Sequence, residues 1–268
     1  MGVAMAATAG LFVASKDHMR RQAIEIETTQ AARATIDIIV RDLRLGGACL
    51  PVTGEYISLE GSDGGEEDEI VTRTGLTRPD LSCIRSATPI TVTTPAEGND
   101  VQVQRAEGFL ENMRAYITSP QTGTGEYFTI TSVDTSTNTL GRDRNFTSDY
   151  PPSAGVYAID ERRFYINHFT GPRGELPELM MQVGDDTPLS FAVGIEKLDI
   201  QYQLRRNCPP CDVVDLPSLG SEFEDPEWPI VEQIFLTVTA RSEVPSSDGD
   251  YYRRTMQVGI KPRNLLPR

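Results

Sequence analysis

Residues 31–47, AARATIDIIVRDLRLGG, decide the fold. Their apolar side chains recur at positions i, i+4, i+7, i+8 and i+11, a spacing that places them on one face of an α-helix. These side chains are Ala32, Ile36, Ile39, Val40 and Leu43. Arg41 and Arg44 stand in the last turn, where positive charge favours the helix dipole, and Gly46-Gly47 then predicts the end of the helix. The stretch therefore predicts an amphipathic helix that packs one face against another layer of the protein.

The same helix is predicted to extend far toward the N-terminus. No proline occurs from Met1 to Leu50, and residues 3–14, VAMAATAGLFVA, carry no charge. A helix from Ala4 to Leu45 would be about 60 Å long at about 1.5 Å per residue, which is longer than a small domain requires. We therefore expect two segments: an apolar helix segment, residues 1–15, that acts as a partial membrane anchor, and an amphipathic spine helix, residues 16–49.

The length of the apolar segment leaves two interpretations open. Spanning the hydrocarbon of a bilayer takes about 20 apolar residues, so the segment is too short to cross by itself. No basic residues precede it, as they would in a cleaved signal peptide. The segment is either the buried start of the helix or the end of a membrane helix whose beginning precedes Met1.

Composition restricts the class of protein. The chain has 268 residues, of which 38% are hydrophobic, so it can build one large or two small domains. It has 25 basic and 39 acidic residues and a formal charge of −14. Nucleic acid is not expected as a partner, because phosphate binding requires a basic face. The 22 glycines and 18 prolines favour many short strands joined by turns.

Alternation of apolar and polar residues predicts three strands near the C-terminus, at residues 198–204, 234–240 and 256–260. Such half-buried strands need a layer on one face, and the apolar face of the helix supplies it. We therefore predict an α+β fold in which a long N-terminal helix packs on an antiparallel β-sheet. Residues 191–268 form the C-terminal strands of that sheet.

Residues 50–190 are predicted to be an inserted β-rich module. Strand candidates rich in Thr, Val, Ile and Tyr are separated by turn residues, and residues 134–138 predict a hairpin turn. The candidates are residues 55–60, 69–74, 88–106, 114–133, 156–159 and 162–166.

Four cysteines are compatible with two disulfides and an oxidising compartment. Three pairings are possible, and we favour Cys49–Cys83 with Cys208–Cys211, because the C-P-P-C segment keeps its two sulfurs close. Free thiols, a redox centre and half of a zinc site are the alternatives for C-P-P-C. A redox centre would place its first cysteine at a helix N-terminus, whereas this segment lies in a proline-rich loop.

The sequence shows no catalytic pattern. His18 and His168 are the only histidines, and neither has the spacing of a zinc site or a nucleophile triad. Phosphate-binding loops and hydrolase motifs are also absent from the sequence. We therefore expect no catalytic residue, cofactor or metal, and a function other than catalysis.

Three segments carry a resemblance to a known family. They are LFVAS (11–15) with IDIIVRDLRLGGAC (36–49), FAVGIEKLDIQYQL (191–204), and WPIVEQIFLTVTARSE (228–243) with YYRRTMQVGIKPRN (251–264). Together they resemble PilW-like minor type IV pilins and, more distantly, J-type minor pseudopilins of type II secretion. The resemblance implies a long helix whose first half lies in the inner membrane or filament core, with a globular β-domain outside.

Members of this family start with a leader that a prepilin peptidase removes before methylating the new N-terminus. This chain shows neither the cleavage site nor the acidic residue near the mature start. We therefore expect the start at Met1 to be a truncation, the alternative being a divergent protein that bypasses processing.

The resemblance implies a structural minor pilin that helps to initiate or cap type IV pilus assembly through helix–helix and β-domain contacts. Its expected partners are other minor pilins, the major pilin and the inner membrane, through the N-terminal helix. Its expected location is the bacterial inner membrane, with a periplasmic domain, and the pilus filament or its tip. The alternatives are a pilus-tip or surface-binding adhesin built on residues 50–190, a type II minor pseudopilin, and a periplasmic redox enzyme using Cys208 and Cys211.

Overall fold

The predicted helix is present as one continuous element, α1 (Gly2–Leu45), in the computed structural model of the chain. The structure describes residues 2–51, 58–65, 67–80, 82–85, 90–91, 93–171, 174–206, 208–214, 230–246 and 249–262, with backbone only for residues 2–14. The strands are β1 (Leu59–Ser62), β2 (Glu69–Gly75), β3 (Asp100–Gln102), β4 (Arg114–Thr118), β5 (Gly125–Asp134), β6 (Thr139–Arg142), β7 (Gly155–Gly171), β8 (Gly174–Val183), β9 (Leu189–Val193), β10 (Ile195–Leu204), β11 (Val213–Val214), β12 (Val231–Arg241) and β13 (Arg253–Ile260).

The strands form two antiparallel sheets. The larger has nine strands in the order β1-β2-β7-β4-β5-β6-β3, with β8 and then β9 added alongside β7. The smaller has four strands in the order β11-β10-β12-β13. Because α1 packs on these antiparallel strands, the predicted α+β class is confirmed.

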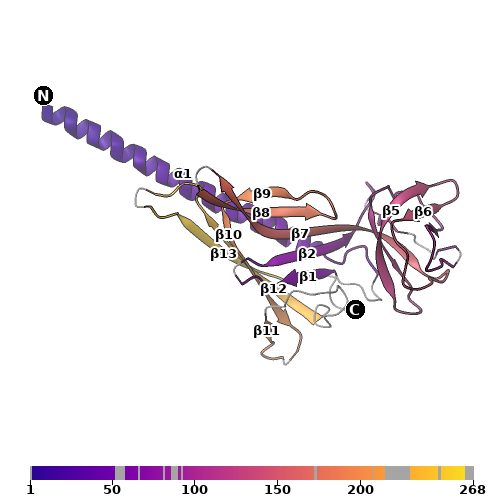
Figure 1. The fold of residues 1–268 in the computed structure, drawn as a ribbon. Helices are drawn as coiled ribbons and strands as arrows, with labels where there is room; N and C mark the ends of the chain where they lie inside the picture. The colour runs from indigo at the N-terminus through magenta and orange to yellow at the C-terminus, as the bar shows by residue number, and fades with distance from the viewer. Residues whose placement is uncertain are drawn as a thin grey trace.

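Two main apolar cores divide the β-structure. The proximal core joins the C-terminal part of α1 to the four-stranded sheet and to parts of β1, β2, β7 and β8. The distal core lies between Ile84 and Ala158 and is built from β3 to β6 and the first half of β7. Figure 1 shows the distal strands β5 and β6 at the opposite end of the molecule from the N-terminus.

Residues 50–190 therefore contribute to both cores. Leu59 on β1, Ile70 on β2 and Leu179 on β8 belong to the proximal core together with the helix. β9 crosses the expected boundary at residue 190 and pairs with β8.

The C-terminal strand predictions are confirmed by β10, β12 and β13. β10 pairs with β12, and β12 pairs with β13. β2 matches the strand predicted at 69–74, and residues 135–138 form the expected turn between β5 and β6. Of the candidate at 55–60, residues 55–57 lie outside the described residues, and β1 begins at Leu59.

The candidate at 88–106 is mostly wrong. Only β3 is a strand there, and residues 93–99 form none; residues 88, 89 and 92 lie outside the described part. The carbonyl oxygens of Pro95, Ala96 and Gly98 accept hydrogen bonds from the Arg142 guanidinium instead of from a neighbouring strand.

The two strands predicted at 156–159 and 162–166 are one 17-residue strand, β7. The residues between them, Asp160 and Glu161, are accommodated in the sheet because each carboxylate has a guanidinium partner. Arg162 contacts Asp160 at 2.8 Å, and Arg73 on β2 contacts Glu161 at 2.5 Å.

Candidate functional site

The two ends of α1 have different surroundings. The predicted stripe of the helix lies in the proximal core, and Ala32 and Ile39 have no exposed surface. Residues 15–23, in contrast, are all exposed. Figure 1 shows the N-terminal part of the helix projecting beyond the sheets. The arrangement fixes the C-terminal half of the helix in the domain, and the half before it is exposed where its side chains are described, at residues 15–23.

Two large apolar side chains stand out on the exposed half. Met19 is 65% exposed and Ile26 is 57% exposed. They are seven residues apart, which is close to two full turns, so they share one face of the helix. His18 lies on the same half of the helix, and its side chain is hydrogen-bonded to the side chain of Gln22, one turn further along.

Charged residues fix the C-terminal end of α1 to β7. Asp42 is buried, and Arg162 lies 3.2 Å from its Oδ2. Burial raises the pKa of Asp42, and the Arg162 guanidinium opposes that rise. An isolated buried carboxylate would be costly, so Arg162 is the partner that lets Asp42 stay in the helix-end packing.

A second buried cation joins the strands next to this helix end. Arg73 on β2 is 2% exposed and reaches Glu161 on β7 at 2.5 Å and Glu60 on β1 at 2.8 Å. No sequence pattern predicts this network, because its members are far apart and spaced irregularly. Only the charged run Asp160–Arg163, inside an otherwise apolar stretch, was a possible signal.

Two disulfides are present, as predicted. The long-loop disulfide joins Cys49 to Cys83, just after the end of α1. It lies against β2, where the backbone N–H of Gly75 donates a hydrogen bond to the carbonyl oxygen of Ala48. Any side chain at position 75 would collide with Cys49, because a Cβ there would lie 2.6 Å from the Cβ of Cys49. The disulfide therefore links the helix end to the segment that follows β2.

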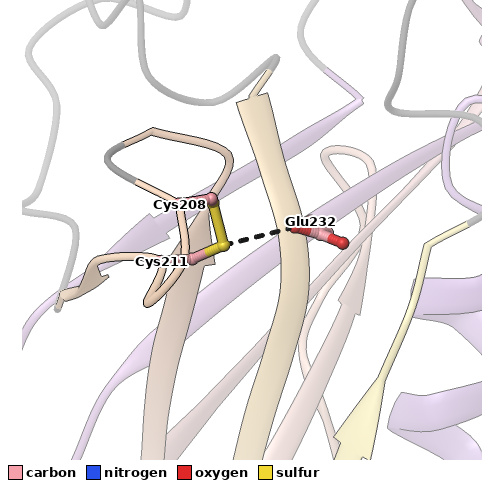
Figure 2. Close-up of side chains that lie close together, drawn as sticks. All are labelled: Cys208, Cys211 and Glu232. Carbon is pink, nitrogen blue, oxygen red and sulfur yellow. Dashed lines mark hydrogen bonds between the residues drawn. A yellow bond between two sulfur atoms is a disulfide. The ribbon is translucent and has the colours of Figure 1, made fainter.

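The short-loop disulfide joins Cys208 to Cys211 in the connection between β10 and β11. Figure 2 shows the sulfur of Cys211 directed at the carboxylate of Glu232 on β12, with Sγ 3.8 Å from Oε2. The three side chains form the group of potential metal ligands found among the described residues. In the disulfide form, the sulfurs offer no thiolate to a metal.

Redox chemistry also fits this group poorly. Reduction would place two thiols beside the carboxylate of Glu232, and a neighbouring negative charge disfavours the reactive thiolate. The pair also lies in a loop rather than at a helix N-terminus. The geometry favours a covalent closure of the β10–β11 connection.

Two further polar contacts join residues that are far apart in the sequence. His168 on β7 lies between two carboxylates, with Nε2 2.6 Å from Glu67 and Nδ1 2.5 Å from Glu175. Next to Glu67, Asp68 is buried and joins the two sheets: it accepts the backbone N–H of Ile200 at 2.6 Å. Burial raises the pKa of Asp68 to about 6.

Comparison with known proteins leaves the fold and these contacts as the basis for function. No protein-family model and no curated protein sequence matches the chain. Within the segments that resemble minor pilins, residues 228–229 and 263–264 lie outside the described residues. Among the described residues, no helix has a stretch long and apolar enough to cross a membrane.

Proposed function

We propose that the chain is a structural subunit of the minor-pilin type, which takes part in initiating or capping a type IV pilus and has no catalytic role. The observation that carries the proposal is the division of α1 into a half packed in the domain and an exposed half. A helix that served only the domain would be covered along its length, because exposed apolar side chains gain nothing from remaining in water.

The exposed half offers a surface for other helices. Met19 and Ile26 share one face, and the uncharged residues 3–14 continue the helix away from the sheets. Helices of other minor pilins and of the major pilin would bury this surface in a filament core or at the inner membrane. The acidic β-domain would then remain on the periplasmic side or at the filament surface.

A second candidate function is surface binding by the distal end. The distal core is separate from the one that holds the helix, which supports the proposal that this part of residues 50–190 is an inserted β-rich module. Its place at the end opposite the N-terminus would suit a pilus-tip adhesin (Figure 1). A minor pseudopilin of type II secretion would use α1 in the same way.

Deletion in the bacterium that carries the gene tests the proposal. We expect loss or scarcity of surface pili, with the major subunit still made and retained in the inner membrane. Complementation with Cys208→Ser/Cys211→Ser should restore pili, because this disulfide is assigned a stabilising role. Normal pili with lost attachment would favour the adhesin, and intact pili with loss of a thiol-dependent activity would contradict the pilin proposal.

Two matched substitutions locate the effect on α1. The double variant Met19→Asp/Ile26→Asp changes exposed positions, so the domain should fold normally while pilus assembly fails. Leu110→Asp is the control, because Leu110 is 61% exposed in the distal part of the chain. Equal piliation by the two variants would show that the exposed half of α1 is not used for assembly.

A further inference from the structure

The edge strands of the two sheets are protected unequally. An exposed edge offers unpaired backbone N–H and C=O groups to any extended chain, and natural proteins block it with short strands or charged residues. β11 has two residues and β3 has three. β1 has four, including Glu60, and β13 carries Arg253 and Arg254.

β9 is the edge without this protection. Its sequence, LSFAV, has no charged residue and no proline, and among the named strands it pairs only with β8. Leu189 is 65% exposed, Phe191 37% and Val193 36%. Figure 1 shows β9 as the outermost strand on its side of the sheet.

Charge around β9 indicates which kind of chain would pair with it. The hairpin from Gly174 to Val193 carries four carboxylates and no lysine or arginine. They are Glu178 and Asp186, together with Glu175, which contacts His168, and Asp185, which lies 3.8 Å from Arg114. A second copy of this chain would bring the same four carboxylates to the contact, and like charges at close range oppose pairing. A partner with basic residues would be attracted instead.

Apolar surface continues from β9 toward the helix. Val193 borders a groove together with Ile24 and Ala31 of α1 and Val244 beyond β12. Two arginines and two glutamates also line this groove, so its formal charges balance. The preference for a basic partner therefore comes from the acidic hairpin. An added strand could therefore place one of its apolar side chains over Val193.

We propose that β9 is a docking edge that binds an extended segment of another protein, with alternating apolar residues flanked by lysine or arginine. Backbone hydrogen bonds to the free edge would supply the pairing, and the exposed side chains of β9 would supply the apolar contact. This surface is distinct from the exposed half of α1, so the inference holds whether or not the chain is a pilin.

Three synthetic peptides test the proposal on the purified chain. The first is Lys-Lys-Val-Thr-Ile-Thr-Val-Lys-Lys; the second has glutamate in place of lysine; the third has proline in place of the central isoleucine. Fluorescence polarisation of labelled peptides should give at least tenfold weaker binding for the second and third. Amide hydrogen exchange should show peptide-induced protection at residues 189–193.

Two variants make the location falsifiable. Phe191→Ser should weaken binding of the first peptide at least tenfold, and Leu110→Ser, at an exposed position away from β9, should leave it unchanged. If Phe191→Ser lowers the melting temperature, Leu189→Ser replaces it, because Leu189 is more exposed.

Three outcomes would overturn the inference. They are equal binding of the three peptides, absence of binding, and protection confined to residues outside 189–193. Sedimentation of the chain alone as a dimer that Phe191→Ser dissociates would overturn it as well, since the occupant would then be a second copy.

Discussion

Ile39 is the position at which the helix packing can be tested most directly. It lies in the middle of the stripe of α1, has no exposed surface and belongs to the proximal core. Ile39→Ala removes every side-chain carbon beyond Cβ, and such truncations cost about 2–5 kcal/mol, depending on how far the surroundings collapse into the space. The helix end is fixed by the Asp42–Arg162 ion pair and the long-loop disulfide. Because α1 cannot easily shift, we expect the upper half of that range, about 3–5 kcal/mol.

Differential scanning calorimetry measures this loss. In chains of about 150–250 residues, 1 kcal/mol corresponds to about 2–4 °C in the melting temperature, so the proximal transition should fall by about 6–20 °C. Ile39→Val should cost only about 0.5–1.5 kcal/mol. Ile26→Ala is the matched control on the same helix: its side chain is 57% exposed and alanine favours helix, so the change should stay within about 0.5 kcal/mol.

The pattern across the three variants decides the matter. Similar shifts for Ile39→Ala and Ile26→Ala would mean that the stripe does not hold the domain together, and the packing described for α1 would be refuted. If the distal core unfolds in a transition of its own, that second transition should keep its midpoint in all three variants, because Ile39 does not belong to it.

Three other predictions concern covalent and ionic links. Replacing the two cysteines of the long-loop disulfide by serine should lower the free energy of unfolding in urea by about 4 kcal/mol, and the same change in the short-loop disulfide should lower it by about 2 kcal/mol. The difference is expected because the paired cysteines are 34 and 3 residues apart. The opposite order would contradict the loop-entropy reasoning. Asp68 has its pKa raised from 3.8 to about 6 in the folded protein, so the folded state binds its proton more tightly and this contribution to stability is lost as pH rises from about 4 to about 6. Relative to Asp68→Asn, the wild type should therefore lose about 3 kcal/mol between about pH 3 and about pH 7.5, and parallel pH profiles of unfolding would contradict this. Arg73→Met should cost about 3–5 kcal/mol by leaving Glu60 without its buried cation and Glu161 with Arg114, 3.7 Å away, in place of the closer Arg73. Arg105→Met, at an exposed ion pair, should cost less than about 1 kcal/mol in the same assay.

The parts of the fold that could be predicted are those with a local pattern. The stripe of α1 follows from a spacing of three and four residues, and β10, β12 and β13 follow from alternation, because each periodicity reports the face that an element buries. The C-P-P-C disulfide was favoured for the same kind of reason, since its two cysteines are close along the chain.

Contacts between distant residues could not be predicted in this way. Asp160 and Glu161 were predicted to separate two strands, yet Glu161 meets Arg73 from a position 88 residues away. No strand was predicted at residues 174–183, yet β8 forms there and pairs on both sides, although it contains Pro177, a residue that argues against a central strand. Both errors have one cause: the partner that makes the charge or the proline tolerable is supplied by the tertiary fold.

The continuity of β7 determines how the helix and the distal core are joined. Phe164 and Ile166 of this strand lie in the proximal core, whereas Val156 and Ala158 lie in the distal one. A flexible linker would let the two parts reorient, but here a single strand, hydrogen-bonded to β2, β4 and β8, runs through both. Arg162 near its middle also holds the end of α1. If α1 is packed among other helices as proposed, the same strand would transmit its orientation to the distal core, so every copy in an assembly would present its distal surface in one fixed direction.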